Sequence, residues 1–332
     1  MVIDKAVAAT CTKTGLTEGK HCSRCKVVLV ARKTVAKKAH TYKTTVTPAT
    51  TSKDGKAVAA CTVCKVVAKT VVIPKIASIG LSSPAYTYDG KVKTPTVTVK
   101  NSKGTTLKNG TDYTVTYASG RKIPGQYAVK ITFKGNYSGS KTLYFTILPG
   151  VTSKIATATN SSAIKIAWKA VPGATGYRVF QYDTKTKKYV TLKTTTGTSY
   201  TVTKLKSGTS YKFAVRAYTT VNGKVYWASG YKTITATTNP GTPTLKAVAG
   251  TKKATLSWNK QNGATGYLLY MATSKNGKYT KIATLKGNTK VSYTKTGLTK
   301  GRYYYFKVIA YKTVGSTNLY GAYSSVRYVK VK

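Results

Sequence analysis

The residues of this 332-residue chain with the clearest chemical potential are five cysteines and two histidines, all within residues 1–75. Cys11 lies eleven residues before Cys22, and Cys25 completes a Cys-x-x-Cys. His40 follows after one further strand-length run. A tetrahedral zinc ion takes four such ligands, and a Cys-x-x-Cys turn directs two sulfurs to one point. The sequence therefore predicts a structural zinc site at Cys11, Cys22, Cys25 and His40.

A second Cys-x-x-Cys lies in a repeat of the same segment, at Cys61 and Cys64. The two repeats read AATCTKTGLTEGKHCSRCKVV (8–28) and PATTSKDGKAVAACTVCKVV (48–67). The second repeat has Thr51 where the first has Cys11, and no histidine follows its cysteines, so it cannot build the same site alone. Its cysteine pair is compatible with a disulfide, with free thiols or with a shared metal ion.

Other chemical states are compatible with the first set as well. In an exported protein, Cys11 can pair with Cys22 or Cys25 in a disulfide, which leaves one of the five cysteines over. The thiols can also stay reduced without a ligand. His21, beside Cys22, is an alternative metal ligand. A redox enzyme is not indicated, because no βαβ pattern surrounds either Cys-x-x-Cys.

The elements that must position these residues are predicted to be strands. Tyr (27 residues), Val and Thr are abundant, and all three favour strands. No window has the pattern of a long amphipathic helix, and 332 residues are typical of two to four domains. The predicted fold class is therefore all-β, with small β modules in tandem.

Two units of about 90 residues repeat each other in the C-terminal half. AIKIAWKAVPGATGY (163–177) matches ATLSWNKQNGATGY (254–267), and LKSGTSYKFAVRAY (205–218) matches LTKGRYYYFKVIAY (298–311). Both units resemble fibronectin type III domains, in which a core Trp on an early strand precedes a Tyr on the next strand. The resemblance places Tyr211 and Tyr304 at that family's tyrosine corner, whose hydroxyl bonds back to the backbone. It implies two β-sandwiches, with immunoglobulin-like and fibronectin-like modules in a row.

The remaining segments resemble modules of bacterial surface proteins. YTYDGKVKTPTVTV and the Gly-Asn-Tyr-Ser-Gly before a Phe-Thr-Ile strand are similar to an Ig-like repeat of Gram-positive gut bacteria. The cysteine repeats resemble zinc-ribbon-like repeats that precede such modules in clostridial proteins, although Lys26 and Lys65 stand where those repeats have Gly. The predicted domains are 1–75 (two units, about 1–42 and 43–75), 76–149, 150–238 and 239–332.

The charge is extreme, with 56 Lys and Arg against 6 Asp and Glu, a formal +50. Such a chain attracts polyanions. The lysines are spread along the whole sequence and alternate with apolar residues, as in Ile164-Lys165-Ile166, which predicts a solvated strand face. A dedicated polyanion site is the alternative, and weak non-specific binding to nucleic acid at low salt is expected in either case.

Catalysis is not predicted. The six carboxylates are scattered over separate modules, and Asp54 and Asp89 each precede Gly, which is typical of turns. No nucleophile motif, phosphate-binding loop or dinucleotide fingerprint is present. No catalytic and no organic-cofactor residues are therefore assigned. Trp227 is the one tryptophan outside the core pattern, and it is a candidate platform for stacking of sugars or bases.

These observations predict a non-enzymatic structural or adhesion module of a secreted or wall-associated protein. Its expected partners are anionic wall polymers, glycans, or host or bacterial surface proteins, and a monomeric module is expected. The sequence shows no signal peptide and no membrane span, so an extracellular location implies a fragment of an exported protein. The alternative is a basic, zinc-ribbon-containing protein that binds nucleic acid.

Overall fold

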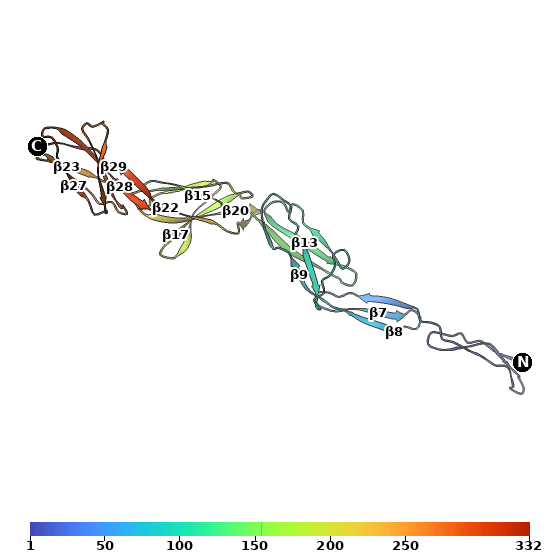
Figure 1. The fold of residues 1–332 in the computed structure, drawn as a ribbon. Helices are drawn as coiled ribbons and strands as arrows, with labels where there is room; N and C mark the ends of the chain where they lie inside the picture. Colours follow the sequence, from blue (N-terminus) through green and yellow to red (C-terminus); the bar gives the residue numbers. More distant parts are fainter. Residues whose placement is uncertain (154) are drawn as a thin grey trace. The chain divides into compact units, whose positions relative to one another are not determined.

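The fold was analysed in a computed structural model, which describes residues 1–153 and 155–332 (Figure 1). These residues form strands and turns and contain no helix, so the predicted all-β class is confirmed. The chain divides into two compact units, which are described separately. The first contains residues 1–86, 92–121 and 126–146, and the second contains residues 87–91, 122–125 and 147–332.

The cysteine repeats fold as three small sheets, two in the first repeat and one in the second. In the first repeat the strands are β1 (Val2–Asp4), β2 (Gly15–Leu16), β3 (Gly19–His21), β4 (Val28–Val30) and β5 (Thr34–Val35). They form a β1-β3-β4 sheet and a β2-β5 pair. In the second repeat β6 (Tyr42–Thr47), β7 (Gly55–Cys61) and β8 (Val67–Ile73) form one sheet in that order.

Gly15 and Gly55 show that the two repeats fold alike. A Cβ on either residue would stand 2.4 Å from a backbone nitrogen, that of Ala9 in the first repeat and that of Ala49 in the second. The hairpin arms therefore cross so closely at this point that only glycine fits.

The cysteine repeats bury very little. Among the described residues 1–75, the buried hydrophobic side chains are Ala9, Cys11, Ala49, Cys61 and Ile73. All six residues of β6 are exposed, as are the three of β4. A segment with so small a core needs another source of stability.

Residues 76–149 supply two further sheets. β9 (Ile76–Leu81) pairs with β11 (Val97–Asn101), and the second sheet has the order β10-β14-β13-β12. Its strands are β10 (Ala85–Thr87), β12 (Tyr113–Tyr117), β13 (Gly125–Phe133) and β14 (Ser140–Leu148). Strict alternation buries Val99, Ile131, Phe145 and Ile147 completely.

The C-terminal units are two β-sandwiches with one topology. In the first, β15 (Ile155–Thr159), β16 (Ile164–Trp168) and β19 (Ser199–Val202) face β18 (Lys188–Thr195), β17 (Gly176–Asp183), β20 (Ser210–Val221), β21 (Lys224–Trp227) and β22 (Lys232–Thr237). In the second, β23 (Leu245–Gly250), β24 (Lys253–Trp258) and β27 (Ser292–Thr296) face β26 (Thr280–Lys286), β25 (Gly266–Ala272), β28 (Tyr303–Val314), β29 (Thr317–Tyr323) and β30 (Arg327–Lys330).

The repeated Trp and Tyr meet in each sandwich core. The Trp168 and Tyr177 ring centroids are 5.3 Å apart, and those of Trp258 and Tyr267 are 5.4 Å apart, both in edge-on geometry. Such edge-to-face pairs add to the energy of burial. The two sandwiches therefore repeat each other in three dimensions as well as in sequence.

The tyrosine corners predicted at Tyr211 and Tyr304 are confirmed. The Tyr211 hydroxyl accepts a hydrogen bond from the backbone N–H of Lys206 at 2.9 Å, and the Tyr304 hydroxyl accepts one from Thr299 at 3.2 Å. These bonds tie each long strand to the turn that precedes it. The hydrogen bonds at Thr299 also lower the pKa of Tyr304.

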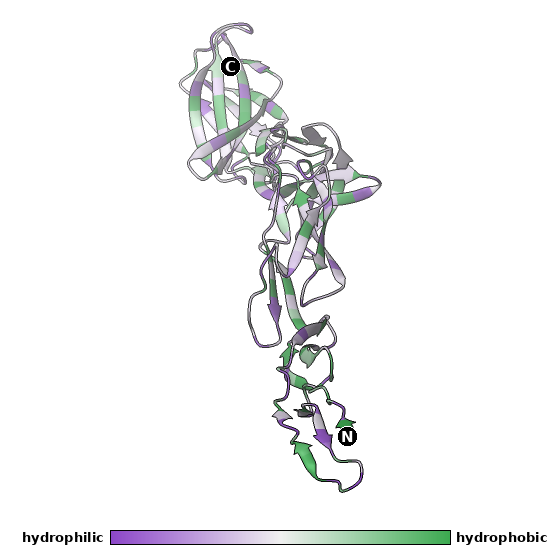
Figure 2. Cartoon of the chain, turned by 90° about the vertical axis from the view of Figure 1, so that its right-hand side faces the viewer, coloured by the Kyte–Doolittle hydropathy of each residue, from purple (hydrophilic) through white to green (hydrophobic). Residues whose placement is uncertain are grey.

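The predicted alternation of lysine with apolar residues is confirmed on the strands. Ile164 and Ile166 are fully buried, while Lys165 between them is exposed. Figure 2 shows the same interleaving of hydrophobic and hydrophilic residues along the strands of the C-terminal sandwich. In the described part of the chain, no helix has the length and apolar character needed to cross a membrane.

Candidate metal centre

A tight turn after β7 presents Cys61 and Cys64. The backbone N–H of Cys61 donates to the carbonyl of Val66 at 2.9 Å, and the N–H of Lys65 donates back to the carbonyl of Cys61 at 3.0 Å. Lys65 closes the turn with φ 62°, a left-handed conformation that glycine adopts more easily. The turn holds both sulfurs together at the end of the β7–β8 hairpin.

Cys11 reaches this turn from the first repeat. It lies in a loop closed by Thr10, whose backbone N–H donates to the carbonyl of Lys13 at 3.0 Å. The N–H of Lys38, in the segment that links the repeats, donates to the carbonyl of Thr10 at 3.0 Å. This bond draws the linking segment, and with it His40, toward the Cys11 loop.

His40 lies two residues before Tyr42, the first residue of β6. Tyr42 pairs with Cys61 across β6 and β7, and the backbone N–H of Thr62 donates to the carbonyl of Thr41 at 2.9 Å. The His40 ring stacks on Tyr42 with centroids 5.5 Å apart. Strand pairing therefore places the imidazole beside the second Cys-x-x-Cys turn.

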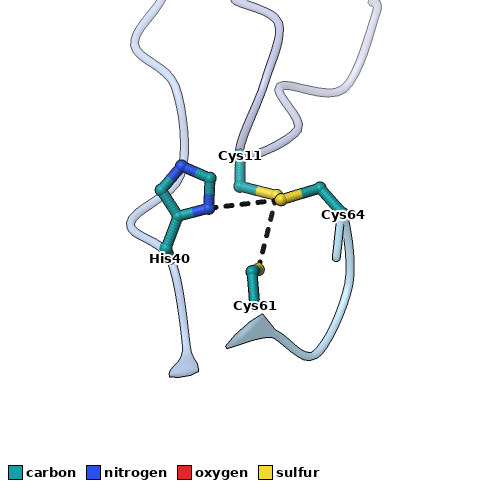
Figure 3. Close-up of side chains that lie close together, drawn as sticks. All are labelled: Cys11, His40, Cys61 and Cys64. Atoms are coloured by element: carbon teal, nitrogen blue, oxygen red, sulfur yellow. Dashed lines mark hydrogen bonds between the residues drawn. The ribbon is translucent and has the colours of Figure 1, made fainter. Parts of the chain in front are cut away.

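The four side chains converge on one point (Figure 3). Their ligand atoms all lie within 4.8 Å of one another. The sulfurs of Cys11 and Cys61 are 3.9 Å apart, and the Cys64 sulfur is 3.3 Å from Nδ1 of His40. In a zinc tetrahedron with Zn–S bonds of about 2.3 Å, two sulfurs stand about 3.8 Å apart, and a sulfur and a nitrogen about 3.6 Å. The cluster therefore has the donor set and the spacing of a tetrahedral metal site.

The thiols of the cluster differ in acidity. The backbone N–H of Cys64, together with His40, stabilises the thiolate of Cys61 and lowers its pKa to about 5. The pKa of Cys11 is raised to about 11, first by its hydrogen bond with Cys64 and then by burial. At neutral pH, Cys61 is thus a ready ligand, whereas Cys11 must lose a proton before it binds.

We expect zinc binding at pH 7 to release the Cys11 proton. Titration calorimetry in two buffers of different ionisation enthalpy counts the protons released, and Cys11→Ala should lower that count by about one. Cys61→Ala should leave the count nearly unchanged, because a group with a pKa of about 5 is already ionised at pH 7. An equal loss of protons in both variants would contradict this assignment.

The structure changes the predicted ligand set. Cys11 and His40 lie in the cluster, but Cys22 and Cys25 do not, and Cys61 and Cys64 take their places. The reason is the hairpin of the first repeat. Its β1–β3 register pairs Val2 with His21, beside Cys22, while the bridge between Val7 and Leu16 lies at the other end, beside the Cys11 loop. Cys11 and Cys22 thus lie at opposite ends of one hairpin.

The alternative ligand His21 has another partner. Its Nδ1 lies 3.0 Å from the carboxylate of Asp4 on the neighbouring strand. All five cysteines are free in the structure, so the alternative of a disulfide between Cys11 and Cys22 or Cys25 is not formed there. A shared metal ion, considered above for Cys61 and Cys64, is the state that this geometry fits.

Trp227, the candidate stacking platform, lies half-buried at the end of β21. Its ring centroid is 5.1 Å from that of Tyr218 and 4.6 Å from the guanidinium carbon of Arg178. The guanidinium carbon of Arg216 lies 5.6 Å from the same ring. The indole therefore belongs to an intramolecular stack, and its role as a ligand platform stays a prediction.

The chain is similar in sequence to parts of known proteins. The chain is 27% identical over 263 residues to exoglucanase B of Cellulomonas fimi, covering 72% of this chain and 22% of that protein. It is 31% identical over 158 residues to chitinase A1 of Niallia circulans, covering 42% of this chain and 22% of that protein. The chain thus spans about a fifth of the length of these relatives.

A solved structure and a family model also match the chain. A two-domain fibronectin type III segment of chicken tenascin matches 55% of this chain and 99% of its own, with 17% identity and a TM-score of 0.37. The family model for the fibronectin type III domain matches residues 150–228 and 238–327, which together make up just over half of the 332 residues. The chain therefore belongs to the fibronectin type III family.

Proposed function

We propose that this chain is a non-catalytic extracellular module, a spacer or adhesion segment of a secreted or wall-associated bacterial surface protein, in which a structural zinc ion joins the two N-terminal repeats. The observation that carries the zinc proposal is the composite cluster, because its ligands come from both repeats and from the segment between them. We also propose domain boundaries at 75/76, 149/150 and 238/239.

The donor set favours zinc over harder cations. Three sulfurs and one imidazole are borderline-soft ligands, whereas calcium and magnesium prefer oxygen. Half of the cluster is buried, since Cys61 is 1% exposed and Cys11 is 7% exposed, while His40 and Cys64 are half-buried. Two of the few buried hydrophobic side chains of the repeats are thus metal ligands. A structural ion here compensates for the missing core.

The carboxylates support a non-catalytic role, because five of the six bond to backbone N–H groups or to a histidine. Asp54 accepts a hydrogen bond from the backbone N–H of Lys75, and Asp112 accepts one from Lys108. Asp89 and Asp183 each accept a hydrogen bond from the backbone N–H two residues later. At Asp183, the bond from Lys185 lowers the pKa of the carboxyl. Asp4 pairs with His21. A hydrolytic enzyme would instead direct paired carboxylates at a common substrate.

The relatives support an accessory, extracellular role. Two of them are named as an exoglucanase and a chitinase, and the similarity covers about a fifth of each. A segment of this size within a polysaccharide-degrading protein suits a spacer or binding module. The +50 charge, distributed over exposed strand faces, suits contact with anionic wall polymers, and glycans or surface proteins are further partners.

We expect the full chain to bind purified Gram-positive cell walls at low salt and to be released as salt rises. Binding through many exposed lysines weakens steeply once the Debye length falls below about 10 Å. A co-sedimentation assay over a salt series measures this, with walls stripped of their anionic polymers as the matched control. Equal binding to stripped walls, or binding that salt does not change, would reject the electrostatic part of the proposal.

A further inference from the structure

The Cys22–Cys25 turn repeats the local structure of the metal-binding turn. The backbone N–H of Cys22 donates to the carbonyl of Val27 at 2.9 Å, and the N–H of Lys26 donates to the carbonyl of Cys22 at 3.1 Å. The equivalent bonds of the second repeat measure 2.9 and 3.0 Å. Lys26 has φ 60°, against 62° for its counterpart Lys65. The first turn is therefore built to hold two sulfurs as the second one does.

The first turn differs from the second in what faces it. Within the described residues, no cluster of three or more metal-binding side chains includes Cys22 or Cys25, and Cys25 is exposed. In the second repeat the imidazole comes from His40, two residues before the strand residue that pairs with Cys61. In the first repeat Val2 pairs with His21, so the position equivalent to His40 lies before residue 1. Among the described residues, no histidine therefore lies beside Cys22 and Cys25 in the place that His40 takes beside Cys61 and Cys64.

The loop at Thr51 in the second repeat is the counterpart of the Cys11 loop in the first. It folds like the Cys11 loop, since the N–H of Thr50 donates to the carbonyl of Lys53 at 2.9 Å and the Lys53 N–H bonds the Thr50 hydroxyl at 3.0 Å. No third Cys-x-x-Cys follows the repeat that contains this loop, since Cys64 is the last cysteine of the sequence. The backbone of Ala49 instead exchanges hydrogen bonds with Asn136 and Ser138, both at 2.9 Å. The cysteine is thus present in the loop that faces a Cys-x-x-Cys turn and absent from the loop that faces another kind of module.

We propose that Cys22 and Cys25 form half of a second zinc site, which is completed by a cysteine and a histidine from a further repeat of the same type. Each zinc ion then joins two successive repeats, with one repeat supplying the loop cysteine and the linker histidine and the next supplying the Cys-x-x-Cys. This inference rests on the proposed zinc ion at the Cys11, His40, Cys61 and Cys64 cluster.

A tandem version of the chain tests the proposal. A copy of residues 1–41 placed directly before the full chain brings a copied Cys11 and His40 to the Cys22–Cys25 turn, with the histidine two residues before Met1. We expect zinc content, measured by elemental analysis, to rise from about one ion per native chain to about two per tandem chain. Cys22→Ser should return the tandem to about one and leave the native chain at about one.

Cysteine alkylation followed by peptide mass spectrometry provides a second readout. In zinc, Cys22 and Cys25 should alkylate readily in the native chain and be protected in the tandem. A tandem in which the copied Cys11 and His40 are changed to Ser and Ala is the matched control, and there the protection should disappear. Equal alkylation of Cys22 in the native and tandem chains would overturn the half-site. A native chain that binds no zinc would instead contradict the proposed site at Cys11, His40, Cys61 and Cys64, so the two failures are distinguishable.

Discussion

Chelation of zinc from the loaded protein is expected to unfold residues 1–75 and to leave the two sandwiches folded. The cysteine repeats bury few side chains, and two of these, Cys11 and Cys61, belong to the candidate metal cluster. In such sites the free energy of metal binding is the free energy of folding. We expect a chelator to speed proteolytic cleavage within residues 1–75 at least about tenfold. Limited proteolysis with mass spectrometry measures this directly.

The tryptophans provide an internal control for the chelation experiment. All three, Trp168, Trp227 and Trp258, lie in the sandwiches, so their emission should not change when zinc is removed. Cys61→Ser should mimic the chelator, because it removes one ligand from the cluster. Cys25→Ser, at the matching turn of the first repeat, should have little effect. Resistance of residues 1–75 to protease after verified removal of zinc would contradict the structural role of the ion.

The sandwiches could be predicted from the sequence because their signals are local and occur twice. The fibronectin type III resemblance implies that a core Trp and Tyr lie on consecutive strands, and the structure brings the rings of Trp168 and Tyr177 to 5.3 Å. The tyrosine corner likewise spans a few residues, from Lys206 to Tyr211. Patterns of this length survive in a single sequence, because alternation and turn chemistry act between near neighbours.

The metal centre could be predicted only in part, because its ligands are distant in sequence. Cys11 and Cys61 are separated by 50 residues. Proximity along the chain favoured Cys22 as the partner of Cys11, but an antiparallel hairpin carries its loop away from its open end. The feature that identifies the correct partners of His40 is the pairing of β6 with β7, which sets Tyr42 opposite Cys61 and so places His40 beside Cys61. Residue spacing alone does not show this pairing.

The left-handed lysines mark another limit of sequence patterns. Gly is expected after the second cysteine of each turn, and its replacement by Lys26 and Lys65 counted against a metal-binding turn. The structure gives these lysines φ 60° and 62°, the conformation that glycine would adopt. Non-glycine residues reach this region at a small energetic cost, which the hydrogen bonds of the turn offset. The turn geometry therefore survives the substitution.

The largest expected effect on the second sandwich follows from truncation of Tyr267. Its side chain is completely buried, in contact with Trp258, and its hydroxyl makes two hydrogen bonds. It accepts from the backbone N–H of Gln261 at 2.9 Å and donates to the carbonyl of Asn288 at 3.0 Å. We expect Tyr267→Ala to lower the free energy of unfolding of this sandwich by about 3–5 kcal/mol, the usual cost of removing a large aromatic ring from a core.

A conservative variant separates the ring from its hydroxyl. Tyr267→Phe keeps the packing but removes the hydroxyl from the buried N–H of Gln261 and from the part-buried carbonyl of Asn288, which should cost about 1–3 kcal/mol. Tyr177→Phe is the matched variant of the first sandwich, where the described hydrogen bond of the hydroxyl is the one it accepts from Val171 at 2.7 Å, so a smaller loss is expected. Urea unfolding followed by tryptophan emission measures all three variants. Equal losses of unfolding free energy for the two Phe variants would show that the Asn288 bond adds nothing. If Tyr267→Ala loses the most, Tyr267→Phe less and Tyr177→Phe the least, the second core depends on both the ring of Tyr267 and its hydroxyl.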